Sequence, residues 1–156
     1  MSADEKVAPI PPGPRLVPYL AVSDARAAIE FYVDVLGMRE QSRIEMDDDR
    51  IGHAELSLGH AKLYLADEFP EIDIVGPATR GGTTVSLHLY VEDVDAVVAA
   101  ARKAGATQEG DTKNELHGDR SAKIVDPFGH RWLLATRIEE VSPEEIARRY
   151  GQSTAS

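Results

Sequence analysis

Two stretches of the chain repeat apolar residues at helical spacing, and short apolar runs surround each of them. In residues 25–36 the apolar positions recur every three or four residues, which places them on one face of an amphipathic helix. Residues 94–103 show the same spacing. Asp24 and Asp93 stand immediately before these segments as N-cap residues, and a glycine follows each segment. The pattern predicts two capped helices.

Short apolar or alternating segments predict strands before and after each helix. They lie at residues 16–22, 39–45, 53–58 and 61–66 in the first half, and at 83–91, 107–110, 121–125 and 130–137 in the second. Each half therefore reads strand, helix and three strands. An α+β chain can contain two such units by chance, but an internal repeat constrains the fold more strongly than any single propensity.

The repeat and its flanks predict the domain organisation. We expect a disordered, Pro-rich tail at residues 1–14, a domain at 15–140, and a C-terminal helix and tail at 141–156. Within the domain, module 1 covers about 15–68, a linker 69–82, and module 2 about 83–140. Ser142 and Glu145 form a capping box that starts the last helix. This helix lies outside the repeat, and we interpret it as a packing or dimer-contact element.

Composition and charge exclude several classes of function. The 156 residues contain no cysteine, which excludes disulfides, thiolate metal sites and cysteine nucleophiles. A formal net charge of −10 opposes binding to nucleic acids and to anionic membranes. The sequence shows neither a signal peptide nor an apolar run long enough for a membrane helix. We therefore expect a cytoplasmic protein.

Specific motifs in both halves resemble a known superfamily. Residues 17–24 (VPYLAVSD), followed by Ala-Ile-Glu-Phe-Tyr at 28–32, resemble the first module of the vicinal oxygen chelate superfamily, which includes glyoxalase I, extradiol dioxygenases and bleomycin-resistance proteins. Residues 86–95 (SLHLYVEDVD) and 126–130 (DPFGH) are similar to its second module. The PhnB-like branch is the most similar. This resemblance implies two tandem βαβββ modules that form a curved, cup-like sheet with helices on the outer face.

The resemblance also implies where a divalent metal would bind. Enzymes of the superfamily take two ligands from each module, one from its first strand and one from its last. Counting from the shared motifs places these positions at Val17, Tyr64, Ser86 and Leu134. Valine and leucine carry no donor atoms, and neutral hydroxyls are poor ligands for a divalent ion. We therefore expect no metal and no other cofactor, and ordinary glyoxalase I or dioxygenase activity is disfavoured.

Strand alternation predicts which side chains face the cup. They are Tyr19, Lys62, Tyr64, Ser86, His88, Tyr90, Trp132 and Leu134. The intervening leucines at 63, 65, 87, 89 and 133 would pack under the helices. An aromatic face with a few polar groups is typical of a small-molecule pocket. Aromatic side chains that simply fill the cup are the alternative interpretation.

Four further polar residues are candidates for chemistry. His88 is the candidate catalytic residue, because imidazole titrates near neutrality. His53 and Glu55 share one strand face, and with His88 they would form a displaced metal site or an acid–base pair. The alternative is a structural role, since a single histidine on a strand is more often a hydrogen-bonded structural residue. Arg120 would bind a ligand carboxylate or phosphate, or would pair with Asp119 or Glu115 as a structural bridge.

The sequence therefore leaves three functional hypotheses. The first is a metal-independent protein that binds a small molecule, such as a drug, in the cup or at a dimer groove. The second is a lyase, isomerase or dioxygenase built around His53, Glu55 and His88. The third is a structural or regulatory domain with a filled cup. The resemblance implies a homodimer, and exposed sheet edges favour one.

Overall fold

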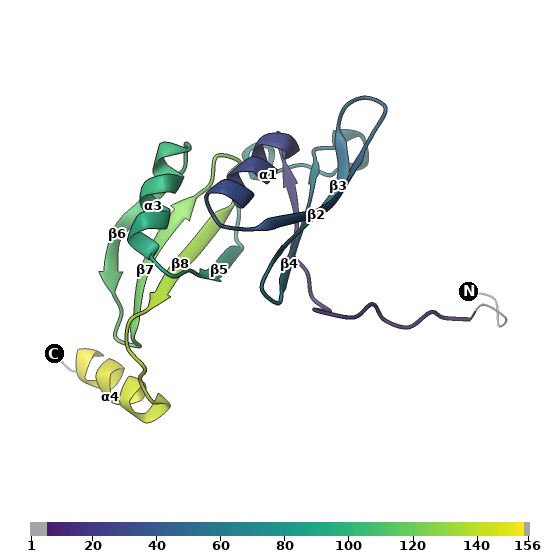
Figure 1. The fold of residues 1–156 in the computed structure, drawn as a ribbon. Helices are drawn as coiled ribbons and strands as arrows, with labels where there is room; N and C mark the ends of the chain where they lie inside the picture. Colours follow the sequence, from purple (N-terminus) through teal and green to yellow (C-terminus); the bar gives the residue numbers. More distant parts are fainter. Residues whose placement is uncertain (1–5, 155–156) are drawn as a thin grey trace.

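The computed structural model describes residues 6–154 and contains the two expected modules (Figure 1). The N-terminal module comprises β1 (Tyr19–Val22), α1 (Ala25–Asp34), β2 (Arg39–Glu45), β3 (Ile51–Leu58) and β4 (Ala61–Asp67). The C-terminal module comprises β5 (Ser86–Tyr90), α3 (Val94–Lys103), β6 (Thr107–Asn114), β7 (Asp119–Val125) and β8 (Arg131–Arg137). The α+β repeat predicted from the sequence is therefore confirmed.

Each module folds into one four-stranded mixed sheet with the same topology. The strand orders are β1-β4-β3-β2 and β5-β8-β7-β6. The first strand of each module runs parallel to the last, and the remaining pairs are antiparallel. A helix connects the first strand to the other three, as a crossover requires. This topology places β1 and β5 at the edges of their sheets.

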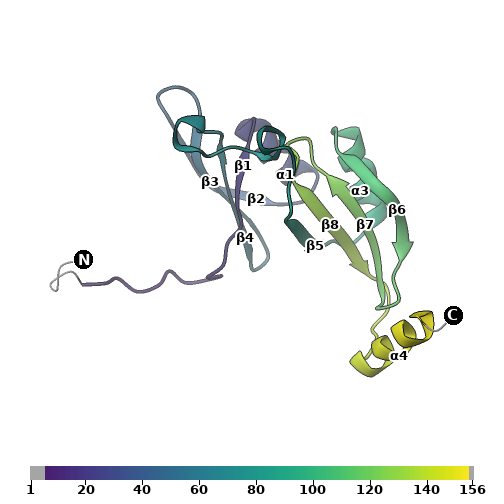
Figure 2. The same ribbon diagram turned by 180° about the vertical axis from the view of Figure 1, so that it is seen from behind.

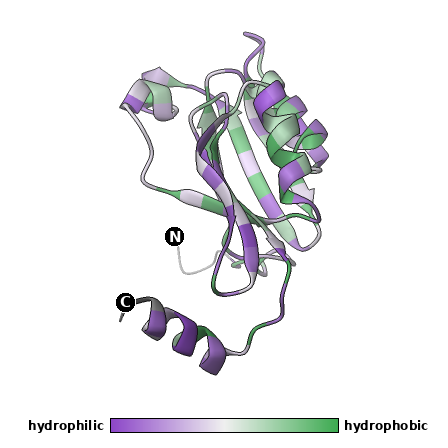
Figure 3. Ribbon diagram, turned by 90° about the vertical axis from the view of Figure 1, so that its left-hand side faces the viewer, coloured by the Kyte–Doolittle hydropathy of each residue, from purple (hydrophilic) through white to green (hydrophobic). Residues whose placement is uncertain are grey.

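The helices α1 and α3 lie on the same side of the two sheets (Figures 1 and 3). Figure 2 shows the molecule from behind, with the opposite, open faces of the sheets toward the viewer. Alternating side chains of the strands therefore point either into the core beneath the helices or onto an open face. Leu63 and Leu65 are buried on the core side, as predicted, and Leu87 and Leu89 pack against the same core.

The helices begin where the sequence predicts. The carboxylate of Asp24 accepts a hydrogen bond from the amide of Ala27 at 3.1 Å, and Asp93 accepts one from Ala96 at 3.1 Å. These side chains satisfy amide groups that have no partner within the first turn. Gly105 follows α3 with a φ of +102°, a left-handed conformation that glycine adopts without strain.

The segments outside the modules differ in part from the expectation. The linker contains a short 3₁₀ helix, η1 (Pro70–Ile72), and a short helix, α2 (Pro77–Arg80). The last helix, α4 (Pro143–Thr154), begins at the predicted residue and continues five residues beyond the predicted end. Residues 6–14 of the predicted tail are exposed and lie outside helices and strands, whereas residues 1–5 lie outside the described part of the chain.

A buried carboxylate joins the two modules. Asp126, in the turn before β8, accepts hydrogen bonds from the Tyr32 hydroxyl at 2.6 Å and from the Trp132 indole at 2.9 Å. Its other oxygen accepts two backbone amides of the same turn, each at 2.9 Å. Tyr32 belongs to α1 of the N-terminal module. The ring of His130 reaches the carbonyl of Ala21 in β1 at 2.9 Å. These contacts fix the modules against each other.

Candidate functional site

The register of β8 corrects one set of predicted site residues. In the C-terminal sheet, Leu87 pairs with Trp132 and Leu89 pairs with Leu134. Neighbours in register share a face, so Trp132 and Leu134 point toward the helices, where they are 2% and 0% exposed. The prediction that they line the open face was wrong. Leu133, which pairs with His88, takes that face instead. A shift of one residue reverses the face of every side chain in a strand.

Four predicted site residues do come together on the open face of the N-terminal sheet. Tyr19 in β1, His53 and Glu55 in β3, and Tyr64 in β4 are neighbours across paired strands. Their ring centroids are 5.3 Å apart for Tyr19 and His53, 5.0 Å for His53 and Tyr64, and 5.8 Å for the two tyrosines. Three aromatic rings therefore gather beside one carboxylate.

Hydrogen bonds connect three of these side chains in a row. The Tyr19 hydroxyl lies 2.6 Å from Nδ1 of His53, and Nε2 of the same ring lies 3.1 Å from the Glu55 carboxylate. Partial burial, and then the negative charge of Glu55, raise the pKa of the Tyr19 phenol above its usual value. Tyr19 is therefore a neutral phenol at physiological pH, and a phenolate nucleophile is disfavoured.

An apolar hollow of about 600 Å³ adjoins Tyr19 and His53. Its lining comes from the open face of the N-terminal sheet and from the segment after β4: Tyr19, Ala21, Ile44, Met46, Gly52, His53, Ala66, Phe69, Ile72 and Ile74. Phe69 and Ile74 form a β-bridge that shapes this segment into a wall. Part of the predicted linker is therefore a wall of the hollow.

Sequence reasoning missed most of the apolar wall residues. Ile44 lies near the end of the strand predicted at 39–45 and Met46 directly follows it, whereas Ile72 and Ile74 fall in the predicted linker. All four are exposed in the structure. The available signal was large apolar residues in otherwise polar loop segments, since such residues often mark a binding surface when they cluster.

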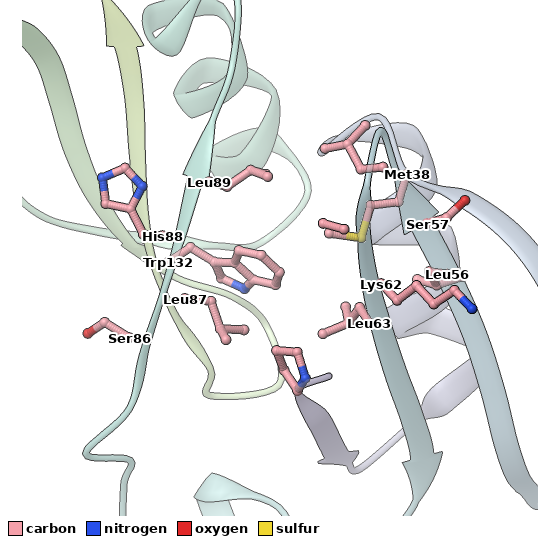
Figure 4. Close-up of a pocket in the computed structure, with 13 residues that line it drawn as sticks. Met38, Leu56, Ser57, Lys62, Leu63, Ser86, Leu87, His88, Leu89 and Trp132 are labelled. Carbon is pink, nitrogen blue, oxygen red and sulfur yellow. The ribbon is translucent and has the colours of Figure 1, made fainter. Parts of the chain in front are cut away.

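A second, smaller cavity of about 220 Å³ lies between the modules (Figure 4). Leu87, Leu89 and Trp132 face Met38 and Leu63 across it. Lys62, Ser86 and His88 also contribute to its lining. In Figure 4 Ser86 and His88 lie on the other side of β5 from the leucines, so the apolar side chains alone form the centre of the crevice.

The structure does not unite His88 with His53 and Glu55. Ser86, His88 and Tyr90 are exposed on the edge strand β5 of the C-terminal module, where the His88 and Tyr90 rings are in tilted contact with centroids 4.8 Å apart. Within residues 6–154, no three His, Asp or Glu side chains gather closely enough to hold a metal ion. The displaced metal site predicted from His53, Glu55 and His88 is therefore absent from the described part of the chain.

Arg120 forms a structural bridge to a partner that the sequence did not indicate. Its guanidinium donates to both carboxylate oxygens of Asp95 in α3, at 2.7 and 3.0 Å, and to the side chain of Asn114 at 3.0 Å. The predicted partners were Asp119 and Glu115. Asp119 instead contacts His117 at 3.2 Å. These contacts use three of the five N–H donors of Arg120 and favour the structural role over ligand binding.

The positions expected to hold a divalent metal do not fit one. Tyr64 and Ser86 lie on different open faces, Leu134 is buried beneath the helices, and Val17 precedes β1. Valine and leucine carry no donor atom, and a neutral hydroxyl binds a divalent cation weakly. The donor set that supports Lewis-acid chemistry in this fold is therefore not built from these four residues.

Comparisons with known proteins agree with this fold. An uncharacterized Mycobacterium bovis protein, Mb0911c, is 39% identical over 136 residues, which are 85% of this chain and 90% of that protein. The antibiotic-binding protein TnmS3 from Streptomyces sp. CB03234 is 26% identical with a TM-score of 0.57, over 78% of this chain and 93% of that one. The PhnB protein from Bacillus cereus shares the fold, with a TM-score of 0.64 at 15% identity over 79% and 99% of the chains.

None of the described helices is long and apolar enough to cross a membrane. Residues 15–134 match the Glyoxalase/Bleomycin resistance protein/Dioxygenase superfamily. The two βαβββ modules and their strand orders are the architecture that this resemblance implies. The chain therefore belongs to the Glyoxalase/Bleomycin resistance protein/Dioxygenase superfamily.

Proposed function

We propose that this protein binds a small molecule, without a metal, in the hollow on the open face of its N-terminal module. The observation that carries the proposal is the composition of the hollow. Of its ten lining residues in the described chain, Tyr19 and His53 are polar, and they are hydrogen-bonded to each other. The other eight are seven residues with apolar side chains and one glycine.

This composition matches the physics of small-molecule recognition. Binding pockets of 300 to 1,000 Å³ are typically apolar, and a few placed polar groups orient the ligand. A hollow of about 600 Å³ lies within that range. The similarity to TnmS3, an antibiotic-binding protein, supports a drug-like ligand.

We further propose that two copies of the chain associate. Tyr19 on one open face and Tyr90 on the other are both more than half exposed, as is Val85 just before β5. Large apolar side chains on sheet faces and edges favour a protein contact. Light scattering coupled to size-exclusion chromatography tests this, and a monomer at micromolar concentration would contradict it.

Enzymatic turnover at the same place is the alternative. The order carboxylate, imidazole, hydroxyl in Glu55, His53 and Tyr19 is the order found in general-base systems. In that case His53, and not His88, would be the proton acceptor. Conversion of a bound compound that stops in His53→Gln would favour this alternative over binding alone.

The binding proposal is tested with a neutral aromatic probe, 1-naphthalenemethanol, by isothermal titration calorimetry. Ile72→Asp places a charge in the wall of the hollow at a side chain that is 66% exposed, so folding is unaffected. We expect this variant to lose binding. Ile138→Asp is the matched control, because Ile138 is 51% exposed and lies outside the hollow. Equal binding by both variants, or a wild type that binds neither this alcohol nor its amine analogue, would contradict the proposal.

A further inference from the structure

The hydrogen-bonded row at the hollow has one direction when His53 is neutral. A carboxylate only accepts hydrogen bonds, so Glu55 requires a proton on Nε2 of His53. In a neutral imidazole the other nitrogen, Nδ1, is then an acceptor, and the Tyr19 hydroxyl donates its proton to it. The single proton of Tyr19 is thereby used. Its oxygen offers lone pairs alone to a molecule in the hollow.

Oxygen acceptors dominate the polar surface near this point. The carbonyl of Gly52, which also lines the hollow, lies 3.4 Å from the Tyr19 hydroxyl oxygen. A ligand that meets these groups must donate hydrogen bonds. An ammonium group carries three donors and no acceptor, and it therefore fits an acceptor-only site better than a carboxylate or a carbonyl.

The polar end of the hollow has a carboxylate, Glu55, directly behind it. Among residues 6–154, His53 is the only side chain within ion-pair distance of Glu55. When His53 is neutral, no positive charge compensates the carboxylate. No lysine or arginine lines the hollow in the described chain. Arg50 stacks on the Phe69 ring at 4.0 Å and pairs with Asp48 and Glu71.

The remaining charged and titratable groups of the sheet do not reverse this balance. Lys62, two residues before Tyr64 on β4, lines the crevice between the modules and not the hollow. Tyr64 lies opposite Glu55 in the register of β3 and β4. The raised pKa of Tyr19, caused by partial burial and then by Glu55, shows that negative charge is disfavoured at the phenol oxygen. Burial disfavours a charge of either sign, whereas the charge of Glu55, the second cause, favours a cation at this point.

Aromatic faces add to the attraction for a cation. Tyr19, His53 and Tyr64 form a cluster with centroid separations between 5.0 and 5.8 Å. A cation within about 6 Å of such a ring is attracted by its quadrupole. The apolar wall, which includes Ile44 and Ile74, offers no side-chain hydrogen-bond partner to a charged group. It accommodates the uncharged part of a ligand instead.

We propose that the hollow selects organic cations, namely protonated amines carried on an apolar body. The ammonium lies at the Tyr19 oxygen and the body fills the space between Ile44 and Ile74. Glu55 acts through His53: it orients the imidazole and supplies the opposite charge. This inference rests on the proposed small-molecule function and names the ligand class for the same hollow.

Three naphthalene compounds that differ in one group test the inference. They are 1-(aminomethyl)naphthalene, which is a cation at neutral pH, neutral 1-naphthalenemethanol, and anionic 1-naphthoate. We expect the amine to bind the full-length wild type about tenfold more tightly than the alcohol, since a charge-assisted hydrogen bond is roughly twice as strong as a neutral one. The naphthoate is expected to bind most weakly of the three. Calorimetry at low ionic strength gives the three affinities.

Two variants separate the contributions of charge and hydroxyl. Glu55→Gln keeps a hydrogen-bond acceptor for His53 but removes the charge, and it should reduce the preference for the amine to less than about threefold. Tyr19→Phe keeps the ring and removes the acceptor oxygen, and it should weaken amine binding about fivefold. Glu30→Gln, on the exposed surface of α1, changes the net charge equally and should have no effect.

The outcomes distinguish the two proposals. If none of the compounds binds, the binding function of the hollow is wrong. If the alcohol and the amine bind equally in the wild type, the hollow binds small molecules but the selection for cations is refuted. If Glu30→Gln reduces the preference as much as Glu55→Gln, the effect comes from net charge and the assignment to Glu55 is overturned. If binding occurs only in a dimer and Ile72→Asp prevents dimerisation, the hollow is a contact between copies.

Discussion

The contact between Tyr32 and Asp126 permits a quantitative prediction about how the modules are held together. Tyr32→Phe removes one hydroxyl and leaves the ring in place. The hydroxyl donates at 2.6 Å to a carboxylate, and both residues are almost completely buried. A hydrogen bond to a charged group contributes about 1.5–3 kcal/mol, so we expect the variant to lose about 2 kcal/mol of unfolding free energy.

Urea denaturation followed by tryptophan fluorescence measures this loss directly. Trp132 is the single tryptophan of the chain and donates to the same carboxylate, with its ring 5.4 Å from that of Tyr32. Its emission therefore reports on the junction between the modules. A loss of about 2 kcal/mol lowers the urea midpoint by roughly 1 M for a chain of this size.

A double-mutant cycle tests the reasoning behind the number. In Asp126→Asn the carboxylate charge is gone, so Tyr32→Phe should cost much less in that background than in the wild type. The buried environment and Asp126 also raise the pKa of Tyr32 well above its usual value, so the hydroxyl stays protonated across the accessible pH range. A cost below about 0.5 kcal/mol in the wild type, or additive costs in the double variant, would refute the role assigned to this bond.

Two further predictions concern single residues. Gly118 has a φ of +100°, and an added Cβ would collide with the backbone between β8 and α4; Gly118→Ala should therefore cost about 2 kcal/mol or more in thermal unfolding, whereas Gly59→Ala, with φ +56° and open space around it, should cost about 1 kcal/mol. Hydrogen bonds from Arg148 and then Arg149 lower the pKa of Glu145 in α4 from 4.5 to about 2. A carboxyl group whose pKa is lowered in the folded state stabilises that state at pH values above the ordinary pKa. This stabilisation is lost as the pH falls through the lowered pKa. As the pH falls from about 4.5 to about 2, the amide chemical shifts of α4 should therefore change before those of the strands. Simultaneous changes in α4 and in the strands would contradict the prediction.

Local rules predicted the elements well because their causes lie within a few residues. Asp24 and Asp93 cap helices through amides three residues away. The glycine after α3 ends its helix because it adopts a positive φ. The end of α4 was harder to predict, since the polar residues after Arg149 carry no apolar periodicity. Ion pairs such as that between Arg149 and Glu139, which cannot be read from spacing, accompany this helix in the structure.

The candidate site was predicted only in part. Alternation correctly placed Tyr19 and Tyr64 on one face of the N-terminal sheet, because each position was counted within a regular strand. The same counting failed in β8, where the buried Asp126 turn sets the register and turns Trp132 into the core. Arg120 donates hydrogen bonds to Asp95, which lies 25 positions earlier in another element. No local pattern in the sequence indicates this pair.

The sequence by itself determined the two-module α+β plan, the start of each helix and the lack of donor atoms at the expected metal positions, since these depend on residue type and short-range spacing. Only the tertiary structure decided that His53 and Glu55 meet Tyr19 and not His88, and that the segment at 69–74 walls an apolar hollow. Contacts between distant residues depend on strand register and module packing. A single turn such as that at Asp126 changes them without altering any local pattern in the sequence.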